Sequence, residues 1–125
     1  MKFTITATCG NARAANLTVN KKKIDTPTFM TIGTYGSVKS LDADDLKECN
    51  VEIILSNAFH LMLRPGTSII NKSGGLHKYM NWDGLILTDS GGYQVFSLGK
   101  EVKVNKDGAE FRSPFDGNKV VMTPE

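Results

Sequence analysis

The segment 85–96 holds the residues of this sequence that are best suited to chemistry. An apolar Leu-Ile-Leu run at 85–87 follows a Trp-Asp-Gly turn, which is typical of a strand buried on both faces. Asp89 stands where that strand should end, and Ser90, two glycines and Tyr93 follow it. The glycines let backbone amides come close to a ligand, and the aromatic ring can stack on a flat group. A carboxylate, accessible backbone and an aromatic ring together suit a flat polar heterocycle.

The same residues also have a structural interpretation. Asp-Ser-Gly-Gly is ordinary turn chemistry, because Asp and Ser hydrogen-bond to their own backbone and Gly relieves strain. On local composition alone, the turn is the simpler of the two interpretations.

A resemblance favours the binding interpretation. Residues 89–94 resemble the Asp-Ser-Gly-Gly-(Phe/Tyr)-Gln motif of the tRNA-guanine transglycosylases, also called queuine tRNA-ribosyltransferases. Further segments resemble the pattern of that family in the same order, namely 26–30, 33–34, 52–61, 63–66, 74–77, 111–117 and 123–125. The sequence departs from the family pattern at Thr31, Tyr35, Ser56 and Ala58, and none of these positions falls within 89–94. The resemblance therefore extends essentially from end to end.

The elements that must position Asp89 alternate between strands and helices. We predict strands at 28–32, 51–55 and 85–88, a helix capped by Asp42 and Asp45 that ends near residue 49, and brief helices at 67–72 and 76–80. Strand, helix, strand is a parallel unit, and polar residues gather where the strands end. This pattern favours a barrel or a doubly wound α/β sheet. Asn57 follows the second strand, so we expect it to face the same pocket as Asp89.

The two ends of the chain have a different pattern. Residues 1–25 alternate polar and apolar side chains around a break at 9–11 and a lysine turn at 21–23, which predicts an antiparallel β opening. Asp-Gly at 107–108 between alternating segments predicts a β-hairpin insertion over 100–122, with a second turn at 113–117. Trp82 and Phe96 are expected in the core. His60, beside an apolar run, is expected to be packed and hydrogen-bonded, and Arg64 to be structural.

The resemblance implies more than these patterns do. It implies an α/β fold in which this chain is roughly the first third of a (β/α)8 TIM barrel, one incomplete catalytic domain with its first β/α units at 28–98. The implied activity is exchange of guanine at the wobble position of a tRNA anticodon for a 7-deazaguanine, through a covalent ribosyl-enzyme intermediate. The resemblance assigns the catalytic and base-binding role to Asp89 and stacking on the base to Tyr93. From their chemistry and their position we also predict substrate contacts by Ser90, Gly91, Gly92 and Asn57.

Composition limits cofactors and location. The chain has 125 residues, 40% of them apolar, and a net charge of +2, which is too small to predict nucleic-acid binding by itself. Cys9 and Cys49 are far apart and form no metal-binding pattern, so we predict no metal site in this segment. The resemblance places a zinc site and the nucleophilic aspartate downstream. There is no secretory signal and no apolar run near the ~20 residues of a membrane span, so we expect a cytoplasmic protein with no membrane partner.

Alternatives remain open at this point. A non-catalytic RNA-binding or partner subunit of the same family is one, although such a subunit has no need of a base pocket at 89–93. An unrelated barrel, such as a glycoside hydrolase with its second carboxylate on a later strand, is another. The resemblance also implies a homodimer or heterodimer, and the sequence does not specify whether the incoming base is queuine or its bacterial precursor.

Overall fold

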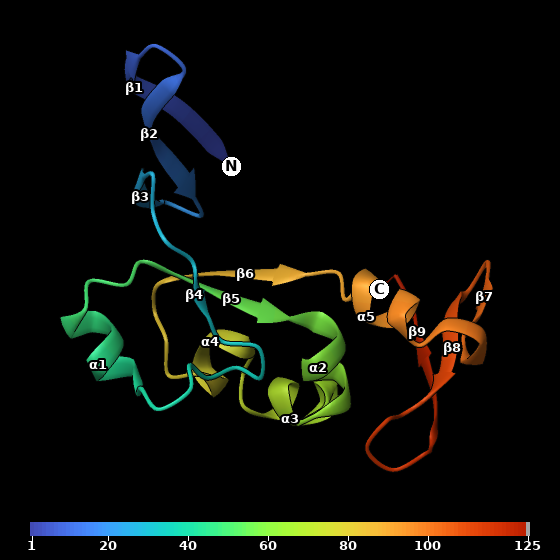
Figure 1. Cartoon of the computed structure of the whole chain (residues 1–125). Helices are drawn as coiled ribbons and strands as arrows, with labels where there is room; N and C mark the ends of the chain where they lie inside the picture. The colour runs from blue at the N-terminus through green and yellow to red at the C-terminus, as the bar shows by residue number, and fades with distance from the viewer. Residues whose placement is uncertain (125) are drawn as a thin grey trace.

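Small β-sheets and short helices make up the described part of the protein, as Figure 1 shows. The structure is a computed structural model that describes residues 1–124, with the backbone alone for Lys100. A parallel sheet with its helices lies between two antiparallel sheets, one from the N-terminal part of the chain and one from the C-terminal part. The fold is therefore mixed α/β, as predicted.

The N-terminal sheet contains β1 (Lys2–Cys9), β2 (Ala12–Val19) and β3 (Lys22–Thr26), adjacent in chain order. Both pairings are antiparallel, and a turn at Asn20 and Lys21 with φ of 48° and 68° joins β2 to β3. A shift of register between Ile5 and Ala7 interrupts the pairing of β1 with β2. The antiparallel opening predicted for residues 1–25 is present and extends to the end of β3.

The central sheet is parallel and contains β4 (Thr31–Ile32), β5 (Ile53–Asn57) and β6 (Leu85–Asp89), again in chain order. Strand β4 is shorter than the predicted 28–32, because residues 28–30 form an exposed connection from the first sheet. Strand β5 begins later than predicted and extends to Asn57. Asn57 is therefore the last residue of β5, and the pairing of the sheet fixes its backbone.

The connecting helices are α1 (Ala43–Glu48), α2 (Ala58–Leu63), α3 (Thr67–Lys72) and α4 (Leu76–Tyr79). Asp42 caps α1 as predicted, because its Oδ1 accepts hydrogen bonds from the backbone N–H groups of Asp44 and Asp45 at 2.8 and 2.9 Å. Asp45 Oδ2 accepts one in return from the backbone N–H of Asp42, at 2.9 Å. This capping box satisfies N–H groups that the helix cannot bond itself. Within residues 1–124, no helix has the length and apolar character that a membrane crossing requires.

Apolar side chains pack on both faces of the parallel sheet near its amino end, whereas Ile32 and Leu87 are 60% and 40% exposed. The prediction that the strand at 85–87 is buried on both faces therefore holds only for its first residues. Successive residues of a strand point to opposite faces, so Ile53 and Ile54 belong to different clusters. The clusters are Ile24, Ile53 and Leu85 on one face, and Leu46, Ile54 and Trp82 on the other. The first cluster joins the N-terminal sheet to the central one.

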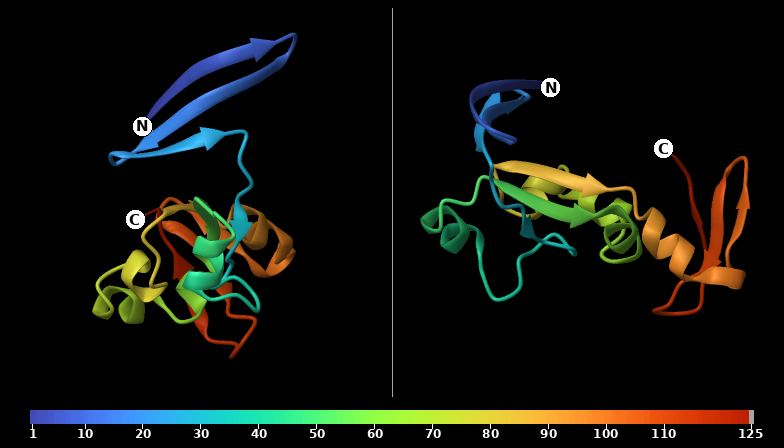
Figure 2. Two further views of the ribbon diagram at one scale, coloured as in Figure 1. Left: turned by 90° about the vertical axis from the view of Figure 1, so that its left-hand side faces the viewer. Right: turned by 45° about the horizontal axis from the view of Figure 1, so that its top comes forward.

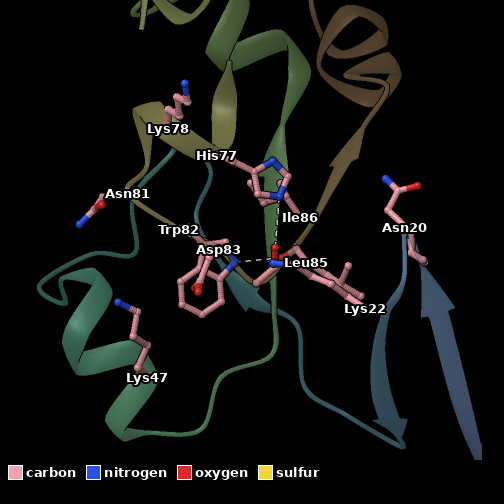
Figure 3. A pocket seen from close by; sticks show the side chains of 12 residues that line it. Asn20, Lys22, Lys47, His77, Lys78, Asn81, Trp82, Asp83, Leu85 and Ile86 are labelled. Carbon is pink, nitrogen blue, oxygen red and sulfur yellow. Dashed lines mark hydrogen bonds between the residues drawn. The ribbon is translucent and has the colours of Figure 1, made fainter. Parts of the chain in front are cut away.

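The amino end of β6 is held by two ring nitrogens, which Figure 3 shows from close by. Trp82, buried as predicted, donates from Nε1 to the carbonyl oxygen of Leu85 at 3.1 Å. Nε2 of His77 lies 3.1 Å from the carbonyl oxygen of Gly84, so it carries the hydrogen. His77 therefore has a structural role here.

The C-terminal part of the chain contains α5 (Gly92–Ser97), the 3₁₀ turn η1 (Gly99–Glu101), and strands β7 (Lys103–Asn105), β8 (Gly108–Arg112) and β9 (Lys119–Met122). The three strands form two successive hairpins, with the turns where they were predicted. Phe111 stacks on Phe59 of α2 with ring centroids 5.4 Å apart. Arg64 lies over the ring of Phe115, its Cζ 4.2 Å from the ring centre. These contacts dock the C-terminal sheet on α2 and give Arg64 the structural role that was expected.

The prediction that Phe96 belongs to the core is wrong, because its side chain is 81% exposed. The half-buried apolar residues here are Val95 of α5 and Leu98, which caps the carboxyl end of the helix. These are one turn apart and lie on the side of the helix away from Phe96. An apolar residue in a short segment does not reveal which face of the helix is packed.

Candidate active site

The carboxyl ends of β5 and β6 bring together two polar side chains that are 32 residues apart in sequence. The parallel register pairs Asn57 with Asp89. Because paired residues of neighbouring strands point to the same face, the side chains meet. Nδ2 of Asn57 donates a hydrogen bond to Oδ2 of Asp89 at 2.7 Å. The structure thus brings together two of the residues that the sequence assigned to one pocket.

The second oxygen of Asp89 is bound by the loop that follows it. Oδ1 accepts a hydrogen bond from the backbone N–H of Gly91 at 3.1 Å. Gly91 has a φ of 69°, and a Cβ added there would lie 2.6 Å from Cβ of Phe59. Both the backbone conformation and the lack of space therefore require glycine. The carboxylate is half-buried and fixed at both oxygens, yet each oxygen keeps a lone pair for a ligand.

Asn57 links this carboxylate to helix α2. Its Oδ1 accepts the backbone N–H of His60 at 3.1 Å, which caps α2, and its own backbone N–H donates to the carbonyl oxygen of Thr34 at 3.3 Å. The residue is only 6% exposed. Its side chain therefore orients Asp89, and a direct substrate contact by Asn57 remains a prediction.

The other predicted site residues lie on the loop and on α5. Ser90 Oγ accepts the backbone N–H of Gly92 at 3.3 Å, and Ser90 is exposed. Tyr93 is 78% exposed and so is free to contact a ligand. Ser90 also borders a hollow of about 510 Å³ between α2 and the end of β9, which is lined by Ala58, Met62, Thr67, Ser90, Val121 and Met122, among others. Asp89 and Tyr93 are not among the residues that line this hollow, so it borders the loop without enclosing the carboxylate or the ring.

His60 is packed between two rings. Its centroid is 4.9 Å from that of Tyr35 and 5.3 Å from that of Phe59. Its Nδ1 is buried and has no hydrogen-bond partner among the described residues. The predicted packing is confirmed, whereas the predicted hydrogen bond is not found at this nitrogen. Sequence reasoning did not assign Tyr35 to this region, although its position just after a predicted strand was a usable signal.

Two further carboxylates could supply acid or nucleophile chemistry, but neither lies at this site. Asp83 precedes β6 and is therefore at the opposite end of that strand from Asp89. Asp116 accepts hydrogen bonds from the backbone and side-chain nitrogens of Asn118 at 3.2 and 2.8 Å. Hydrogen bonding from Ser113, followed by that from Asn118, lowers the pKa of Asp116. It is a turn residue, as its position before glycine predicted.

The described residues do not fit a zinc ion. Within residues 1–124, no three His, Cys, Asp or Glu side chains gather closely enough to hold a metal. Both cysteines are free and exposed. The zinc that the resemblance implies therefore has no ligand set among the described residues, and it remains a prediction.

Known proteins resemble this chain along its whole length. The family model described as queuine tRNA-ribosyltransferase matches residues 8–125. A queuine tRNA-ribosyltransferase of Pseudoalteromonas translucida is 54% identical over 125 residues, which is 100% of this chain and 33% of that protein. Proteins of the same name from Herminiimonas arsenicoxydans and Francisella tularensis subsp. novicida are also 54% identical over the whole chain, which covers 33% and 34% of them.

The chain thus spans about a third of the length of these relatives. The matched residues include the entire parallel sheet, the Asn57–Asp89 pair and helix α5. Since the family model covers nearly every residue, the chain belongs to the queuine tRNA-ribosyltransferase family.

Proposed function

We propose that this chain is the base-binding part of a tRNA-guanine transglycosylase, which replaces guanine at the wobble position of a tRNA anticodon with a 7-deazaguanine. The observation that carries the proposal is the Asp89 carboxylate, held by Asn57 and Gly91 where two parallel strands end. In this proposal, β4 to β6 are the first strands of a (β/α)8 barrel, whose catalytic groups lie at the carboxyl ends of its strands. The names of the relatives support the same activity.

Asp89 has the properties that recognition of a purine-like base requires. An ionised carboxylate is an acceptor only, so its free lone pairs can accept the ring N–H groups of guanine or a deazaguanine. The same group can take or return a proton as the base leaves or enters. Because Asn57 and Gly91 already fix both oxygens, binding a base requires little further ordering of this side chain.

The neighbouring residues complete the base site. The exposed ring of Tyr93 can stack on the base, and Ser90 can bond a ribose hydroxyl. Gly91 and Gly92 carry no side chain that would obstruct the approach. The base must leave the stack of the anticodon loop to reach Asp89, as in other enzymes that act on a base.

The exchange itself needs a second carboxylate. In the proposed step, an aspartate oxygen attacks C1′ of the ribose and the bond from C1′ to the base breaks. The bonding electrons go to the ring nitrogen of guanine, which takes up a proton as it leaves. The incoming deazaguanine attacks C1′ with its own ring nitrogen, gives up the proton of that nitrogen and releases the aspartate as a carboxylate, so that one proton is taken up and one returned in each exchange. Asp83 and Asp116 are in the wrong places for this role, so we assign the nucleophile and the zinc ligands to the part of the relatives that this chain does not span.

Partners and location follow from the activity. The proposed partners are a tRNA with guanine at the wobble position, the 7-deazaguanine base and a second subunit, in a homodimer or heterodimer. A protein that modifies tRNA is expected in the cytoplasm. The family membership excludes the unrelated glycoside hydrolase as an alternative.

The test measures incorporation of labelled guanine into tRNA by this chain extended to the full length of its relatives. Asp89→Asn should reduce exchange by about 10²-fold or more, because asparagine cannot take a proton and presents an NH2 where an acceptor is needed. Binding of tRNA should largely persist, because phosphate contacts carry affinity. Tyr93→Ala should weaken base binding by about 1–3 kcal/mol and leave some turnover.

Asp116→Asn is the matched control, because it removes a carboxylate from a turn of similar composition and should leave exchange unchanged. The 125-residue chain alone should show no exchange, since neither Asp83 nor Asp116 lies where it could act as the nucleophile beside Asp89. Full activity of Asp89→Asn would disprove the assignment. An extended protein that binds tRNA without any exchange would favour the non-catalytic subunit.

A further inference from the structure

Helix α5 is apolar on two faces, and only one of them is packed. Val95 and Leu98 are half-buried, and the helix contacts α2. Tyr93 and Phe96 are 78% and 81% exposed. Residues three apart on a helix are neighbours, so these two rings form one surface, the α5 aromatic face. Adjacent exposed aromatic side chains mark a surface that can bind a partner.

The α5 aromatic face continues directly from the proposed base site. Asp89 is the last residue of β6, and α5 begins at Gly92, so Tyr93 is already in the first turn of the helix. Figure 2 shows α5 following the carboxyl end of the parallel sheet. Close packing of Gly91 on Phe59 holds the start of the helix against α2. The rings are therefore presented from a helix whose start is fixed relative to Asp89.

The chemistry of this face suits unpaired nucleobases. Both exposed side chains are aromatic, and every base has a π-face that can stack on such a ring. The segment Gly92–Ser97 contains no charged side chain, so the face offers no ion pair to a charged protein surface. Extrusion of one base also leaves its neighbour in the loop without a stacking partner. A second ring beside Tyr93 can replace the contact that the neighbour loses.

We propose that Phe96 is a second stacking residue, which holds the nucleotide next to the exchanged guanine. This inference rests on the proposed function. Tyr93 then receives the exchanged base, and Phe96 receives the neighbouring base of the same single-stranded loop. The sequence motif that the family resemblance rests on ends at Gln94, so Phe96 lies outside it. The role of Phe96 is to position the anticodon loop; the chemical step stays with Asp89.

The experiment uses the chain extended to the length of its relatives and an RNA anticodon stem-loop with guanine at the wobble position. A fluorescent 2-aminopurine replaces the nucleotide on one side of that guanine or on the other. The wild-type protein should quench 2-aminopurine at one of these two positions. Phe96→Leu, which keeps an apolar side chain without the ring, should abolish the quenching and weaken binding roughly 5- to 150-fold. Phe96→Tyr should restore both.

Phe29→Leu is the matched control, because Phe29 is 77% exposed but precedes β4 and lies outside the site. It should change neither quantity. Wild-type quenching and affinity in Phe96→Leu would overturn the inference. So would a lower melting temperature of the RNA-free Phe96→Leu protein with quenching intact, since the ring would then be covered by polypeptide. Guanine incorporation by the wild type is measured in parallel: its absence alongside Phe96-dependent quenching rejects the proposed function and supports the stacking role.

Discussion

Two loops of this protein have nearly the same composition and very different bonding. Both the segment 89–91 at the end of β6 and the turn between β8 and β9 contain an aspartate, a serine and a glycine with φ near 70°. Asp116 in the turn between β8 and β9 is bound by Ser113 and Asn118, all within the same turn. Asp89 at the end of β6 is bound by Gly91 nearby and by Asn57 from another strand.

This difference separates a turn carboxylate from a site carboxylate. The bonds of Asp116 are local, so they organise its own turn and nothing more. The bond from Asn57 arises only when two parallel strands have paired, and it aims Asp89 at the edge where barrel enzymes place their chemistry. Local composition supplies the turn in both cases, and the long-range partner identifies the site.

The largest expected effect is a difference in stability between alanine substitutions at the two glycines of these segments. Gly91 and Gly117 have φ of 69° and 72°, but an added Cβ meets Phe59 at Gly91 and nothing within 4 Å at Gly117. Gly117→Ala should cost about 1–2 kcal/mol of unfolding free energy, from the left-handed backbone alone. Gly91→Ala should cost about 2–5 kcal/mol, because overpacking adds to the backbone term. Urea unfolding of both variants measures the difference, and equal costs would mean that the loop after β6 is no tighter than the turn.

A smaller effect is expected at Asn57, where two substitutions can distinguish its role in capping α2 from its role in orienting Asp89. Asn57→Ala removes both the cap of α2 and the bond to Asp89, and it should cost about 0.5–2 kcal/mol of stability together with most of the exchange activity. Asn57→Ser keeps a good capping oxygen but is too short to reach Asp89. It should therefore preserve most of the stability and still lose exchange. Thermal unfolding combined with guanine incorporation gives the answer, and full activity in the serine variant would show that Asp89 needs no partner.

The smallest expected effect is on how the stability of the fold depends on pH, through Asp116. The pKa of Asp116 is lowered below 3.8 by hydrogen bonding from Ser113 and then from Asn118. The folded state therefore binds fewer protons than the unfolded state, so the turn contributes stability above about pH 4 that is lost as pH falls through the folded pKa. Ser113→Ala should weaken the dependence of the unfolding midpoint on pH below about pH 4. The slope is compared with that of wild type at equal salt, and an unchanged slope would remove Ser113 as the cause.

Much of the local structure could be predicted from the sequence. The Asp42–Asp45 capping box, the helix at 67–72 and the turn around Asp-Gly at 107–108 all depend on neighbouring residues, and all are present. Asp89 was placed at a strand end for the same reason. The contact of Asn57 with Asp89 depends on the register of two distant strands, which no local pattern contains.

Packing direction was equally hard to predict. Trp82 and Phe96 are both aromatic residues near apolar neighbours, and one is 4% exposed while the other is 81% exposed. Trp82 is covered because α1 and β5 pack over it, which depends on the crossover between strands. The contact of His60 with Tyr35 has the same origin, since a loop after one strand meets the helix after the next.

The bond between Asn57 and Asp89 also bears on how the sheet assembles. Slipping β6 by one residue would place Thr88 opposite Asn57 and turn Leu87 to the other face of the sheet. The amide would lose its carboxylate partner in that arrangement, although the apolar residues of β6 could still find contacts. The pair therefore favours the native register of β5 and β6 over a register shifted by one residue. A sheet with the shifted register would lack the oriented carboxylate.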